Sequence, residues 1–109
     1  MQLTYIEADE ILTPWLKRYG LHVLTMDREV EVRSIYVVDD AGETYQIFLS
    51  PPDAAGRITV SAWNCKTKRK RKIKEFESAL SELEQALEEA YSHVMEWVKQ
   101  AGHTRTPVL

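Results

Sequence analysis

The sequence contains a single cysteine, Cys65, which excludes a disulfide within the chain and a metal site with several cysteine ligands. No apolar run approaches the roughly 20 residues that a membrane-spanning helix needs. Four glycines are spread singly along the chain, so there is no glycine-rich phosphate loop. The N-terminus has neither the basic start nor the apolar stretch of a secretory signal. We therefore expect a protein of the reducing cytoplasm that does not associate with membranes.

Side chains arranged for catalysis are also scarce. Cys65 precedes a run of cations that would favour its thiolate, but no histidine is near it in sequence to act as a base. Glu89, His93 and Glu96 are spaced so that one metal ion could reach all three on a helix. Dedicated metal sites usually have more ligands and supporting hydrogen bonds. We predict no enzymatic activity, no cofactor and no functional metal site.

Residues 4–64 are predicted to form one helix followed by four strands. Thr4 and Glu7 form a capping box, and apolar residues then recur on one helical face until Gly20. Pro14 either kinks this helix or begins a second short one. From residue 21 the period changes to two, with turn residues between the segments, and a break in alternation near Arg33 predicts a β-bulge. The predicted strands are Leu21–Met26, Val30–Val38, Thr44–Ser50 and Arg57–Asn64.

Residues 73–101 carry the most regular pattern in the chain. Apolar residues recur at alternating steps of three and four, which predicts one long amphipathic helix. The stripe consists of Ile73, Phe76, Leu80, Leu83, Leu87, Ala90, Val94, Trp97 and Ala101. Gly102 is expected to end the helix, and residues 102–109 to form a flexible tail. The predicted fold is a single α+β domain over residues 1–101, α-β-β-β-β-α, with both helices on one face of a four-stranded antiparallel meander.

The predicted C-terminal helix is longer than the sheet that it would cover. It would extend about 43 Å, whereas the diagonal of the sheet is about 30 Å. The projecting apolar turns would need a partner, either the N-terminal helix of the same chain, through Trp15 and Leu16, or another subunit, which we favour. The predicted partner-binding residues are Leu87, Tyr91, Val94, Trp97, Val98 and Trp15.

Seven of the fourteen Lys and Arg residues lie between positions 66 and 74, in a chain of net charge −3. Positive charge opposes the dipole at a helix start, so local stability does not explain this run. This basic run is consistent with four alternative roles. It is either a solvated loop that protects a sheet edge, a contact for an acidic protein, a contact for nucleic-acid phosphates or, in a eukaryote, a nuclear import signal. The predicted contact residues are Lys68, Arg69, Lys70, Arg71 and Trp63, with Tyr36 and Tyr45 as further stacking surfaces.

Two functional hypotheses follow from these patterns. The leading one is a small cytoplasmic protein-interaction module, a homodimer or an adaptor of chaperone-like or immunity-like type, that uses the apolar stripe of the C-terminal helix. In that case polar replacements of Val94 and Trp97 should dissociate the assembly and leave the sheet folded. The alternative is a nucleic-acid-binding domain that uses the basic run and the sheet face.

Overall fold

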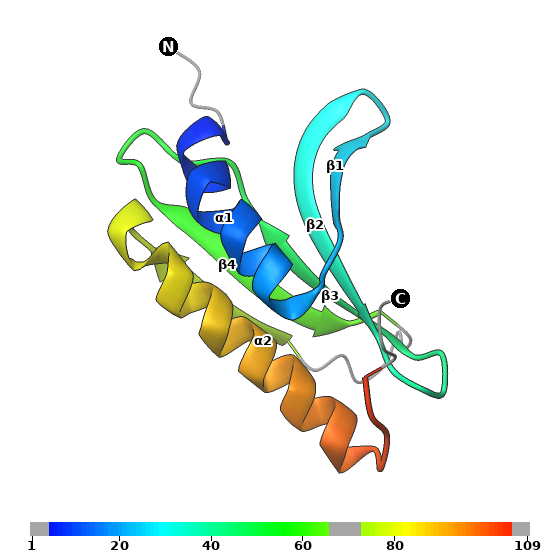
Figure 1. Cartoon of the computed structure of the whole chain (residues 1–109). Coiled ribbons are helices and arrows are strands. Elements are labelled where there is room, and N and C mark those ends of the chain that lie inside the picture. Colours follow the sequence, from blue (N-terminus) through cyan, green and yellow to red (C-terminus); the bar gives the residue numbers. More distant parts are fainter. Residues whose placement is uncertain (1–4, 66–72, 106–109) are drawn as a thin grey trace.

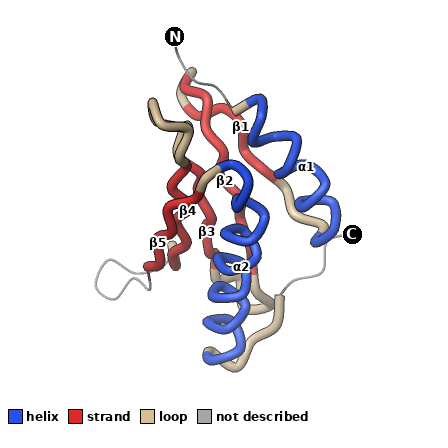
Figure 2. The backbone as a smooth tube through the Cα atoms, turned by 90° about the vertical axis from the view of Figure 1, so that its left-hand side faces the viewer, coloured by secondary structure: helices blue, strands red, loops and turns tan. Residues whose placement is uncertain are grey.

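Five strands and two α-helices follow one another along the chain in the computed structural model, which describes residues 5–65 and 73–105. The elements are α1 (Ile6–Tyr19), β1 (Val23–Asp27), β2 (Val30–Val38), β3 (Thr44–Leu49), β4 (Ile58–Asn64), β5 (Ile73–Ser78), the short 3₁₀ helix η1 (Leu80–Glu82) and α2 (Leu83–Gln100). The strands form one antiparallel sheet in the order β1-β2-β3-β4-β5. Both helices lie on the same side of this sheet (Figures 1 and 2). None of the helices in the described ranges is long and apolar enough to cross a bilayer.

The α+β class, the antiparallel meander and the long C-terminal helix are confirmed, but the sheet has five strands instead of the predicted four. The prediction of a helix from residue 73 is wrong, because residues 73–78 pair with β4 as the edge strand β5. The helix α2 therefore has 18 residues and is about 27 Å long. Its apolar stripe no longer exceeds the sheet, so the length argument for a second subunit fails.

The N-terminal helix is continuous through Pro14. It runs from Ile6 to Tyr19, so the predicted second short helix does not form, and Gly20 ends it with a left-handed φ of 62°. The residue before the first turn is Tyr5; the capping box predicted on Thr4 lies outside the described residues. The buried face of α1 is the apolar one that the spacing predicted, with Ala8, Leu12, Trp15 and Leu16.

The irregularity predicted in the second strand is present where β2 pairs with β1. Leu24 pairs with Ser34, and Met26 pairs with Glu31. An advance of three residues along β2 therefore lies opposite an advance of two along β1, which is a β-bulge. Next to this bulge Arg33 is buried and binds Asp9 of α1, with 2.8 Å between Nε and Oδ1. Arg33 pairs with Leu49 and therefore lies on the face of β2 that meets the helices, and its ion pair ties α1 to β2.

The core lies between the sheet and the two helices. Alternate residues of β2, β3 and β4 point into it: Ile35, Val37, Tyr45, Ile47, Leu49, Ile58, Val60 and Ala62. The helices contribute Ala8, Leu12, Trp15, Leu16, Leu83, Ala86, Leu87, Ala90, Val94, Trp97 and Val98. Because strand residues alternate between faces, the residues between them, among them Tyr36, Gln46, Phe48, Ser61 and Trp63, point to the face on which neither helix lies.

Residues 103–105, which the sequence placed in a flexible tail, are hydrogen-bonded to the turn between β2 and β3. The amide of Asp40 donates to the carbonyl of Thr104 at 2.7 Å, and His103 Nδ1 lies 2.7 Å from Asp39 Oδ2. Burial alone would raise the pKa of Asp39, but hydrogen bonds from His103 and from backbone amides hold it below its ordinary value. These contacts hold residues 103–105 against the turn, and residues 106–109 lie outside those described.

Candidate functional site

Three aromatic side chains lie on the sheet face opposite the helices, one on each of three neighbouring strands. They are Tyr36 on β2, Phe48 on β3 and Trp63 on β4. Tyr36 pairs with Gln46, which in turn pairs with Trp63, so these three residues form one row across the sheet. The ring centroids of Phe48 and Trp63 are 6.4 Å apart. We call Tyr36, Phe48 and Trp63 the aromatic face.

The aromatic face is accessible from solvent. Tyr36 is 41% exposed, and Phe48 and Trp63 are partly exposed. Within the described residues, the hydroxyl of Tyr36 and the indole N–H of Trp63 have no hydrogen-bond partner in the protein. Both ring surfaces and polar groups are therefore available to a ligand here.

The amide of Gln46 lies between Tyr36 and Trp63 and is held in place from two sides. Its Nε2 donates to Ser34 Oγ at 3.1 Å, and Cys65 Sγ approaches its Oε1 at 3.9 Å. Since a glutamine amide has two donor hydrogens and two acceptor lone pairs, one of each is left for a ligand. The centre of the row is thus polar and oriented, and its ends are aromatic.

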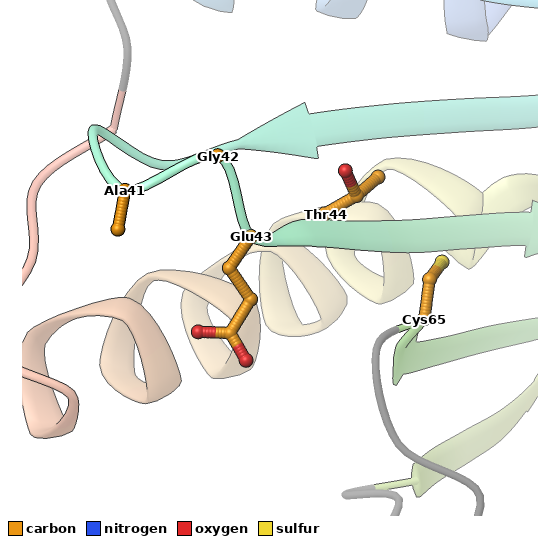
Figure 3. A pocket seen from close by; sticks show the side chains of 5 residues that line it. All are labelled: Ala41, Gly42, Glu43, Thr44 and Cys65. Atoms are coloured by element: carbon orange, nitrogen blue, oxygen red, sulfur yellow. The ribbon is translucent and has the colours of Figure 1, made fainter.

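A hollow of about 320 Å³ lies at one end of the aromatic face, beside the turn between β2 and β3. It is lined by Ala41, Gly42, Glu43, Thr44 and Cys65 (Figure 3). Thr44 and Glu43 extend to opposite sides of β3 in this view. The amide of Cys65 donates to the carbonyl of Thr44 at 2.9 Å, which keeps the two chain segments together. Because Thr44 and Gln46 are two residues apart on β3, they share a face, and the hollow continues the aromatic face toward Cys65.

Acidic residues of β5 lie beside the aromatic face, and the segment that follows β4 in the sequence is rich in cations. The chain leaves the sheet after β4 and returns at Ile73, which pairs with Trp63; the connection between them contains six cations. The predicted contact residues Lys68, Arg69, Lys70 and Arg71 belong to this connection and lie outside the described residues. On β5, Glu75 pairs in register with Ser61, and Glu77 lies 3.9 Å from Arg57 Nε.

The residues predicted to bind a partner through α2 are packed within their own chain. Leu87 and Val94 are 0% exposed, and Val98, Trp97 and Trp15 are also buried. Tyr91 is half-buried, and its ring centroid lies 5.9 Å from that of Trp15. The sequence left two possible partners for the apolar stripe, the N-terminal helix of the same chain or another subunit. In the structure α1 of the same chain packs against α2.

A shared carboxylate strengthens this contact between the helices. Glu88 of α2 accepts hydrogen bonds from Trp15 Nε1 at 3.1 Å and from the hydroxyl of Tyr19 at 2.6 Å. The hydrogen bond to Glu88 is the main cause that raises the pKa of Tyr19. A buried tryptophan usually finds such a partner for its N–H, so this end of the stripe is satisfied inside the protein.

The prediction of Tyr45 as a stacking surface is wrong, and Phe48 was not among the predicted stacking residues. Tyr45 is 1% exposed and lies in the core, where burial, with the charges of Glu43 and Asp39, raises its pKa to about 12. Phe48 is on the opposite face of the same strand and joins the aromatic face. The signal for this was available, because residues three apart on a strand point to opposite sides.

Potential metal ligands converge at a different place from the helical spacing of Glu89, His93 and Glu96 that the sequence analysis considered and set aside. In the described ranges, Asp39, Asp40 and His103 have potential ligand atoms within 4.8 Å of one another. Glu89, His93 and Glu96 on α2 do not form such a group. All three are engaged in the contacts that hold residues 103–105, since Asp40 accepts from Thr104. The ring of His93 packs against Phe76 at 5.8 Å.

Comparisons of this chain with models of protein families, with characterised proteins and with solved structures give no match.

Proposed function

We propose that this protein binds single-stranded nucleic acid on the open face of its sheet. The observation that supports this best is the aromatic face itself, with Tyr36, Phe48 and Trp63 on neighbouring strands and neither helix over them. Aromatic rings on the open face of an antiparallel sheet stack with the bases of single strands. Bases in a duplex are paired and stacked internally, so the proposed ligand is unpaired.

The distribution of charge supports a local binding site on a protein that is otherwise acidic. All seventeen acidic residues lie outside positions 66–74, where half of the cations are gathered. Both ends of the connection between β4 and β5 lie next to Trp63, because Ile73 pairs with Trp63. Cations there would contact the phosphates of a strand whose bases stack on the aromatic face. Other surfaces would repel the strand, which favours one defined site.

A titration with a labelled single-stranded oligonucleotide tests this proposal. We expect binding at about 50 mM salt that weakens by a factor of ten or more at about 200 mM, because counterions are released when cations neutralise phosphates. A duplex of the same sequence should bind more weakly, since its bases cannot reach the rings. If the single strand does not bind at low salt, the proposal is wrong.

A protein-interaction function remains a second candidate, supported by the hairpin of β1 and β2 instead of by α2. Leu24 and Met26 are 42% and 53% exposed and lie two residues apart on β1, and exposed apolar side chains that lie close together often form a protein contact. We expect light scattering at high concentration to give the mass of two chains for the natural sequence. The double variant Leu24→Ser, Met26→Ser should reduce this mass to that of one chain. A single-chain mass for the natural sequence would contradict this candidate.

A further inference from the structure

Glu75 is an acidic side chain beside the aromatic face. It is exposed, and within the described residues it has no hydrogen bond or ion pair. Its register partner Ser61 also pairs with Phe48, which puts all three residues in one row on the open face. Its neighbour Glu77, two residues along β5, lies within 3.9 Å of Arg57. A lone carboxylate here would repel phosphates, so a phosphate-binding role does not explain it.

The position of Glu75 relative to Trp63 allows both side chains to contact one base. Trp63 is two residues from Ser61 on β4 and has the same orientation, so Glu75 and Trp63 are diagonal neighbours on adjacent strands. Such neighbours are about 7–8 Å apart, within reach of long side chains. A base stacked on the indole would present its edge toward the neighbouring strand. Glu75 is therefore placed to contact the edge of a base whose face lies on Trp63.

An ionised carboxylate only accepts hydrogen bonds, and it accepts two side by side. Of the four common bases, guanine alone has two adjacent donors on its Watson–Crick edge, the N1–H and the 2-amino group. On that edge adenine, cytosine and thymine or uracil each have an acceptor next to the donor, so one carboxylate oxygen would face another acceptor. We infer that Trp63 and Glu75 form a guanine-selective subsite, in which the base stacks on the indole and Glu75 accepts from N1–H and the 2-amino group. This inference rests on the proposed function.

Short oligonucleotides that differ in one base test the subsite. The probes are thymidine pentamers whose middle base is guanine, hypoxanthine, adenine or cytosine; hypoxanthine lacks only the 2-amino group of guanine. We expect guanine to bind about tenfold more tightly than hypoxanthine, the usual effect of a good bidentate contact. Equal affinity of the four pentamers would overturn the inference and leave the proposed function in place.

Two variants separate the contact of Glu75 from a general effect of charge. Glu75→Gln should remove the preference for guanine over hypoxanthine, because an amide has one acceptor where the carboxylate has two. It should also strengthen binding of the other pentamers, because a negative charge is lost. Glu77→Gln is the matched control on the same strand and should keep the preference. A preference for guanine that survives Glu75→Gln would show that another residue reads the base.

Free nucleosides test the subsite even if no oligonucleotide binds. The indole N–H resonance of Trp63, assigned by its loss in Trp63→Phe, should shift with guanosine and much less with inosine. That result together with no binding of pentamers would support the subsite and reject the proposed function. No shift with guanosine and no binding of pentamers would reject both.

Discussion

Replacing Val94 with aspartate is expected to unfold the protein. Val94 is 0% exposed on the face of α2 that packs on the sheet, so the variant would bury a carboxylate with no partner. Such a charge costs about 4 kcal/mol or more, which is a large part of the roughly 5–15 kcal/mol that stabilises a typical domain. Circular dichroism and urea unfolding measure the loss. The sequence alone predicted the opposite outcome, a dissociated but folded chain.

Ser92→Asp is the matched control for this prediction. Ser92 is exposed on the same helix, two residues from Val94, and an exposed substitution usually changes stability by less than about 0.5 kcal/mol. A folded and stable Val94→Asp variant would contradict the burial of the stripe. It would also restore α2 as a candidate surface for a partner.

The double variant Tyr36→Ala, Trp63→Ala is expected to lose at least about thirtyfold in affinity for a single-stranded oligonucleotide. Stacking on one aromatic side chain contributes about 1–3 kcal/mol per base, and the two residues lie on separate strands with Gln46 between them. Both side chains are partly exposed, so the fold should survive their loss. Fluorescence anisotropy measures the affinity, and the urea midpoint measures the stability.

Ile6→Ala serves as the control for the loss of apolar surface. Ile6 is 70% exposed on α1, on the other side of the sheet, and its replacement should leave the affinity unchanged. If the double variant binds as tightly as the natural protein, the aromatic face is not the site. An affinity that falls with salt but not with these substitutions would assign binding to the cations alone.

The three central strands could be predicted from the sequence to within about a residue, because their signals are local. Alternation assigned Ile58, Val60 and Ala62 to one face of β4, and the structure buries all three. Turn residues between the strands indicated the meander. Trp63 and Tyr36 were recognised as possible stacking residues from their place on strands, although only the pairing register brings them into one row with Gln46.

The prediction of a helix was wrong for residues 73–78, because the apolar residues there fit the spacing of a helix although the segment forms a strand. Ile73, Phe76 and Leu80 fit steps of three and four, yet β5 covers the first two and η1 begins at the third. An edge strand with charged residues at 74, 75 and 77 shows no clear alternation of its own. Its hydrogen bonds to β4 are contacts between residues distant in sequence, and such pairing overrides local preference.

Periodicity and turn chemistry act between near neighbours, so they were enough to assign most of the elements and their apolar faces. What covers each face depends on how the elements pack together. The stripe of α2 is buried by β5, β4 and α1 of the same chain, whereas Tyr36, Phe48 and Trp63 have neither helix over them. The pairing of β4 with β5 also puts Glu75 beside Trp63, because strand register brings together residues that no local pattern relates.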